Sequence, residues 1–149
     1  MTYEIDVSTL ERSTIASVRR RVTWTEIGEV IGAMFGEVHS FLDANGLGGR
    51  GHNVALYHGA GAQGAELEAG VQLAEAFTAS GDVACSSTPA GRAVHTVHHG
   101  EYHLLGAAHE ALIHWLEERG EKIGLGWEVY GDWHDEPSKR RTDVYRLIG

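Results

Sequence analysis

The sequence predicts an α+β fold: a mostly antiparallel sheet with two long helices on one face. Three observations carry this prediction. Two stretches repeat apolar residues every three or four positions, shorter stretches around them alternate apolar and polar residues, and the order of these elements occurs twice. The order is strand, strand, helix, strand, strand, followed by the same again. The 149 residues have room for a domain with one shared core.

The first half, about residues 1–75, opens with two strands and then changes period. Thr23 and Glu26 have the spacing of a capping box, and apolar residues from Ile27 to Leu42 then form one helical stripe. Asn45 and Gly46 tolerate the left-handed conformation that ends a helix. The strands predicted here cover residues 3–10, 13–22 and 54–57.

Residues 65–77 fit two interpretations. Good helix formers fill this stretch, but Gly70 and Val71 interrupt it, and apolar residues alternate from Leu67 to Leu73. The alternation favours a strand, and a helix stays open as the alternative.

The second half, about residues 76–149, repeats the pattern. A helix is predicted over residues 102–119, and Gly120 ends it. The strands predicted here cover residues 83–87, 93–98, 127–130 and 144–148. Equivalent residues keep a nearly constant offset, 74 positions from Gly46 to Gly120 and 73 from Tyr57 to Tyr130. The constant offset indicates a duplication.

The charge of the chain limits its partners. The formal net charge is −9, which repels phosphate backbones and anionic lipids and favours cationic ligands. The only basic runs are residues 19–21 and 139–141, too short for a nucleic-acid-binding arm. We therefore expect no nucleic-acid partner and no membrane partner, since no apolar stretch reaches the length of a membrane helix.

The cysteine count and the N-terminus point to the cytoplasm. Cys85 is the single cysteine, so it forms no disulfide within the chain and belongs to no zinc site made of several cysteines. Residues 1–4 are polar and acidic, unlike the start of a signal peptide. A reducing, cytoplasmic location is the expectation.

Two short motifs separated by a helix carry a family resemblance. The residues His98-His99-Gly100-Glu101-Tyr102 precede the second predicted helix, and Trp127-Glu128-Val129-Tyr130 follow it. With the duplicated order of elements, the chain resembles the GyrI-like small-molecule-binding superfamily, which includes effector-binding domains of multidrug-sensing regulators.

The resemblance implies two βαββ-type units related by a pseudo-twofold axis, with the ligand site between them. It places the acidic residue that meets cationic ligands on Glu128 and the motif tyrosines on Tyr130 and Tyr102. It also implies that residues 1–149 form a single domain of two half-repeats. No helix-turn-helix segment is present, so we expect a stand-alone member and not a regulator.

Glu128 is the strongest candidate from the residues themselves. It interrupts an apolar strand, where a carboxylate is costly to desolvate without a partner. Residues two apart on a strand share a face, so Glu128 and Tyr130 point the same way, as do Ala55 and Tyr57. Aromatic walls around one carboxylate suit an amphipathic cation. The alternative places Glu128 on the outer face of an edge strand.

Other aromatic residues and one histidine are further candidates for the site. Trp127 and Trp133 flank the Glu128 strand and are expected to line the mouth of the pocket. The resemblance gives His98 a counterpart in the family, which suggests that it orients a group near the site. Trp115 lies on the apolar stripe of its helix and is assigned to the core.

No metal or cofactor is expected. The cluster His95, His98, His99 and His103 lacks the spacing of a ligand set, and no His-Glu-x-x-His pattern occurs. Residues 59–64 match the glycine fingerprint of dinucleotide-binding proteins, but the predicted order provides no series of parallel βαβ units.

Three functions remain open. The chain binds and sequesters lipophilic or aromatic, cationic small molecules, or, as the resemblance implies for some members of the family, it hydrolyses strained, cyclopropane-bearing natural products with Glu128 and Tyr130 as catalytic residues. The resemblance also implies a third function, an inhibitor of a protein target such as DNA gyrase. The first two need the same pocket, so the sequence does not separate them.

Overall fold

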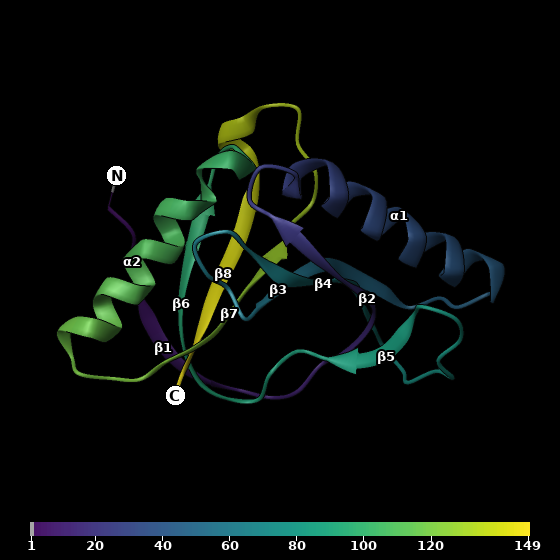
Figure 1. The fold of residues 1–149 in the computed structure, drawn as a ribbon, viewed down its shortest axis with the longest axis horizontal. Coiled ribbons are helices and arrows are strands. Elements are labelled where there is room, and N and C mark those ends of the chain that lie inside the picture. Colours follow the sequence, from purple (N-terminus) through teal and green to yellow (C-terminus); the bar gives the residue numbers. More distant parts are fainter. Residues whose placement is uncertain (1) are drawn as a thin grey trace. The chain divides into compact units, whose positions relative to one another are not determined.

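The computed structural model describes residues 2–149, which divide into two compact units (Figure 1). The middle unit is Arg12–Thr88. The terminal unit combines the N-terminal residues up to Glu11 with Pro89–Gly149. Each unit holds an antiparallel sheet of four strands and one long helix, so the predicted α+β class is confirmed.

In the middle unit, the sheet has the strand order β3-β4-β2-β5, and the helix packs against β2 and β4. Its elements are β2 (Thr14–Thr23), α1 (Ile27–Ala44), β3 (Arg50–His58), β4 (Gly64–Leu73) and β5 (Ala84–Ser87). The buried side of α1 presents Met34, Val38 and Leu42, which belong to the apolar stripe predicted from the sequence.

In the terminal unit, the sheet has the order β1-β6-β8-β7, and the long helix packs against β6, β7 and β8. Its elements are β1 (Asp6–Leu10), β6 (Gly91–His99), the 3-10 turn η1 (Tyr102–Leu104), α2 (Leu105–Glu118), β7 (Ile123–Tyr130), η2 (Pro137–Lys139) and β8 (Arg141–Ile148). The helix predicted over 102–119 thus begins with a 3-10 turn.

The two units share an irregularity of strand register at equivalent positions. The pairing of β3 with β4 shifts between Arg50 and Asn53, and the pairing of β7 with β8 shifts between Ile123 and Gly126. These positions are 73 residues apart, the same offset as between Tyr57 and Tyr130. Such agreement supports the duplication inferred from the sequence.

The outer strand of each unit comes from the other sequence half. Strand β1 precedes β2 along the chain but pairs with β6, and β5 precedes β6 but pairs with β2. The compact units therefore differ from the halves 1–75 and 76–149. That the whole chain forms a single domain stays a prediction.

The stretch 65–77 fits both a strand and a helix by its sequence, and in the structure most of it belongs to β4, so the favoured strand interpretation is confirmed. Gly70, which interrupts the helical pattern of this stretch, is needed for the pairing of β4 with β2. A Cβ at this position would lie 2.6 Å from the carbonyl oxygen of Ala16 on β2, so the glycine permits the close approach of the two strands. The glycine-rich residues 59–64 connect two antiparallel strands, which excludes the dinucleotide fingerprint.

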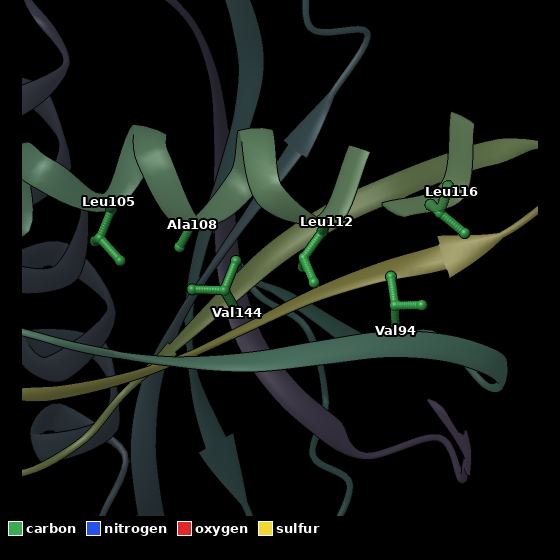
Figure 2. Close-up of a cluster of buried hydrophobic side chains, with 6 residues drawn as sticks. All are labelled: Val94, Leu105, Ala108, Leu112, Leu116 and Val144. Atoms are coloured by element: carbon green, nitrogen blue, oxygen red, sulfur yellow. The ribbon is translucent and has the colours of Figure 1, made fainter. Parts of the chain in front are cut away.

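The core of the terminal unit forms between α2 and two central strands (Figure 2). Figure 2 shows the α2 side chains pointing down onto the strands that carry Val94 and Val144. The helix contributes Leu105, Ala108, Leu112 and Leu116. This packing fixes which side of α2 faces β7 and β8, and so positions the polar residues on that side.

Candidate ligand-binding site

Glu128 is a buried carboxylate on the α2 side of the terminal sheet. Only 2% of its surface is exposed. The register pairs it with Val144, which belongs to the core under α2. Directly paired residues of antiparallel strands share a face, so Glu128 also points toward α2. Its burial speaks against the solvent-facing alternative.

Both oxygens of Glu128 accept short hydrogen bonds. The hydroxyl of Tyr130, two residues along β7, donates to Oε1 at 2.5 Å. Nε2–H of His109, on α2, donates to Oε2 at 2.7 Å. Hydrogen bonds to an ionised acceptor are stronger than those between neutral groups, so these two offset part of the cost of burying the charge.

Arg146 contacts the ring nitrogen of His109 that does not bond Glu128. Its Nη2 lies 3.5 Å from His109 Nδ1, and its Nη1 donates to the carbonyl oxygen of Gly124 at 3.1 Å. Because Nδ1 faces a cationic donor, it is the acceptor nitrogen, and the proton of a neutral His109 sits on Nε2, directed at Glu128. Burial lowers the pKa of Arg146 from its ordinary value.

A glycine makes room for Arg146. Gly126 is the residue of β7 paired with Arg146, and a Cβ at this position would overlap the guanidinium. The glycine therefore lets the side chain of Arg146 lie flat across the strand and reach His109. Arg146, His109, Glu128 and Tyr130 form one chain of polar contacts, which we call the carboxylate relay.

An aromatic cluster continues from the relay to the surface. The rings of Tyr130 and Tyr102 meet edge to face, with centroids 5.6 Å apart, and those of Tyr102 and Trp133 are 6.3 Å apart. Tyr102 comes from η1, and Trp133, which is 64% exposed, comes from the loop between β7 and β8. The aromatic cluster, defined as Tyr102, Tyr130 and Trp133, thus links a buried carboxylate to solvent.

Two other predicted site residues, Trp127 and Tyr57, have clear neighbours within their own units. Trp127 is on the opposite face of β7 from Glu128, because neighbours on a strand point to opposite sides. There it is buried and stacks on Tyr145, with centroids 5.2 Å apart. Tyr57 is in the middle unit, where its ring lies 6.1 Å from that of Trp24.

His98 has a structural task at the start of η1. Its Nε2–H donates to the carbonyl oxygen of Glu101 at 3.0 Å, so Nδ1 is left to accept the hydroxyl proton of Tyr3 at 2.9 Å. His98 therefore holds the turn that carries Tyr102 and acts on the aromatic cluster through backbone placement.

Comparison with protein-family models matches residues 3–147 to the GyrI-like small molecule binding domain. The chain belongs to this family. As a GyrI-like domain it is a small-molecule-binding module. Among curated proteins, none matches significantly.

Solved structures of low sequence identity share the fold. The crystal structure of the EcmrR C-terminal domain is 19% identical, with a TM-score of 0.78, and the match covers 100% of this chain and 99% of that one. EcmrR in a cryo-EM complex with DNA is 18% identical, with a TM-score of 0.83 over 99% of this chain, but the GyrI-like domain spans only 58% of the EcmrR chain.

A third solved structure, SAV2435 bound to tetraphenylphosphonium, is 10% identical with a TM-score of 0.55, and the match covers 100% of this chain and 94% of that one.

Sequence reasoning missed two members of the relay. His109 lay on the apolar stripe of the predicted helix, and a polar residue on a buried stripe was the signal that pointed to a partner. Arg146 had no such signal, since it alternates with apolar residues like an ordinary exposed strand residue.

The GyrI-like domain also contains a second buried carboxylate, in its middle unit. Glu68 of β4 is 2% exposed. It accepts hydrogen bonds from Ser17 Oγ at 2.6 Å, His58 Nε2 at 2.8 Å and Arg19 Nη2 at 3.1 Å. Burial by itself would raise the pKa of Glu68, but bonds from Ser17, Ser86 and His58 outweigh it and lower the pKa.

A cavity of about 560 Å³ adjoins Glu68. It is lined by Ser17, Val18, Arg19, Arg20, Glu68, Asp82, Ala84, Cys85 and Ser86. Because protein donors already occupy both oxygens of Glu68, this carboxylate is tied into the middle sheet.

Within residues 2–149, no three His, Cys, Asp or Glu side chains gather closely enough to hold a metal ion. Of the helices in that range, none has the length and apolar character to cross a membrane. That the protein uses no metal or cofactor stays a prediction.

Proposed function

We propose that this GyrI-like domain binds amphipathic, aromatic cations, with Glu128 as the counter-charge and the aromatic cluster as the wall. One observation carries the proposal: Tyr130 belongs to both parts of the site. Its hydroxyl donates to Glu128, and its ring contacts Tyr102 in the aromatic cluster, which reaches solvent at Trp133. Sequestration of such compounds in the cytoplasm, and resistance to them, is the function that we infer.

The chemistry of the cluster suits a cation better than a neutral ligand. Aromatic faces attract a cation most strongly where water is excluded, and a buried carboxylate supplies a counter-charge there. The net charge of −9 adds a long-range attraction for cations.

The ligand named for SAV2435, tetraphenylphosphonium, is an aromatic cation of the proposed class, which lends support. That the site lies between the two half-repeats, with Tyr57, Trp127 and His98 also lining it, stays a prediction. So does the absence of a nucleic-acid partner.

The test replaces Glu128 with Gln, which keeps the shape and removes the charge. Isothermal titration with tetraphenylphosphonium and with neutral triphenylphosphine oxide measures the role of the charge. We expect phosphonium affinity to fall by about 1–3 kcal/mol and the affinity of the neutral ligand to change much less.

Glu118→Gln, an exposed change on α2, is the matched control and leaves both affinities unaltered. Equal phosphonium affinity in the wild type and Glu128→Gln contradicts the proposal.

Hydrolysis of strained, cyclopropane-bearing compounds is the second candidate. The observation that favours it is the carboxylate of Glu128 between a phenol and an imidazole, at 2.5 Å and 2.7 Å, a geometry able to move protons. A solved structure described as a hydrolase from Listeria innocua shares the fold, with 9% identity and a TM-score of 0.66, and the match covers 98% of this chain and 92% of that one.

Mass spectrometry of an incubated cyclopropane substrate separates the two candidates. Addition of one water to the substrate, lost in Glu128→Gln and Tyr130→Phe, supports hydrolysis. Recovery of unchanged ligand supports binding alone. Inhibition of DNA gyrase stays a prediction, and co-elution of the two proteins tests it.

A further inference from the structure

A cation of the protein itself occupies the outer end of the aromatic cluster. The guanidinium carbon of Arg140 lies 3.8 Å from the ring centroid of Trp133 and 5.9 Å from that of Tyr102. Both distances are within the roughly 6 Å over which an aromatic face attracts a cation.

The backbone of the loop between β7 and β8 holds Arg140 in this position. Its Nε–H donates to the carbonyl oxygen of His134 at 2.8 Å, and Nη2 donates to that of Asp135 at 3.4 Å. Its own carbonyl oxygen accepts the N–H of Gly100 at 3.0 Å. The guanidinium thus ties the C-terminal end of the loop to its middle, next to the face of Trp133.

The charge of Arg140 is balanced differently from the charges of two other arginines of the terminal unit. Arg141 and Arg119 pair with Asp143 and Glu118. Among the salt bridges of residues 2–149, none includes Arg140. Ring faces and carbonyl oxygens therefore provide its contacts, the same kinds of group that receive a ligand cation.

We propose that Arg140 is an internal competitor for the cation-binding face of the aromatic cluster, and so a specificity-determining residue. This inference rests on the proposed function. A cation that reaches Trp133 and Tyr102 meets the positive charge of Arg140 and displaces it. A neutral aromatic ligand meets no such repulsion. Arg140 thereby weakens the binding of all cations and leaves only those with enough aromatic surface to replace it.

The first experiment compares Arg140→Gln with the wild type. Glutamine keeps a donor for the His134 carbonyl and removes the charge from the ring face. We expect tetraphenylphosphonium to bind about five to thirty times more tightly, the value of one partly desolvated cation–π contact, and triphenylphosphine oxide to change less than twofold.

Arg119→Gln is the matched control, because Arg119 also lies 3.8 Å from a tryptophan ring, that of Trp115 on α2. It removes the same kind of contact outside the aromatic cluster, and we expect both affinities to stay as in the wild type. Weaker or unchanged phosphonium binding in Arg140→Gln overturns the inference.

A second measurement follows Arg140 in the wild type. We expect the ring current of Trp133 to shift the Arg140 Nε–H resonance upfield, and saturation with tetraphenylphosphonium to return the resonance toward its ordinary position. An unmoved resonance at saturation contradicts displacement. If phosphonium binding depends on Glu128 but not on Arg140, this inference fails and the proposed function stands. If it depends on neither, the proposed function fails as well.

Discussion

The ion pair between His95 and Asp143 yields the sharpest stability prediction. His95 Nε2 lies 2.7 Å from Asp143 Oδ1, and His95 Nδ1 lies 3.1 Å from Asp6 Oδ2. Both ring nitrogens face carboxylates, so only the protonated imidazole satisfies them together. Hydrogen bonding to Asp143 accordingly raises the pKa of His95.

The same hydrogen bond stabilises the ionised form of Asp143. Burial by itself would raise its pKa, but the hydrogen bonds from His95 and Arg141 outweigh burial and lower the pKa from 3.8 to about 2. A shift of this size corresponds to about 2 kcal/mol of folding stability. Asp143→Asn removes the charge at nearly constant shape, so we expect the free energy of unfolding at pH 6 to fall by that amount.

The stability that the His95–Asp143 pair provides decreases at both low and high pH. A lowered carboxyl pKa stabilises the folded state above 3.8, and this contribution is lost as the pH falls through about 2. A raised histidine pKa stabilises below its ordinary value of 6.5 and is lost as the pH rises through the raised pKa. The cost of Asp143→Asn is therefore largest between about pH 5 and 6.

Urea unfolding at pH 2.5, 6 and 9 measures this profile. Asp6→Asn is the control, because the Asp6 side chain is 66% exposed and solvent screens its pairing. We expect it to cost less than about 1 kcal/mol. An equal loss for Asp143→Asn at pH 2.5 and pH 6 would show that packing, and not charge, explains its effect.

Two further substitutions test the packing of the terminal unit by urea unfolding. Gly126→Ala displaces the Arg146 guanidinium and breaks its bond to Gly124, and we expect a loss of about 1–2 kcal/mol. In an Arg146→Met background the guanidinium is absent and the added methyl group displaces nothing charged. An equal loss of unfolding free energy in both backgrounds would therefore refute the assigned contact. Leu112→Ala empties a fully buried site under α2 and should cost about 2–5 kcal/mol. Leu104→Ala, at an exposed position, should cost under about 0.5 kcal/mol, and similar costs at both positions would contradict the core assignment.

Local periodicity was enough to predict the elements and their repeated order. Apolar spacing of three and four residues marked α1 and α2, and alternation marked β4 in spite of its helix formers. The two-residue spacing of Glu128 and Tyr130 placed them on one face, and their hydrogen bond agrees. Each of these features depends on residues close together in the sequence, where backbone geometry alone sets the relation.

Contacts between distant residues were decided by the tertiary structure. His109 meets Glu128 only because the apolar side of α2 packs on β7 and β8 at one rotation, and this rotation depends on the fit of the whole core. Likewise, no local pattern states that β1 pairs with β6 and not with β2. Periodicity determines which face of an element is buried, but the identity of the partner depends on how all the buried faces fit together.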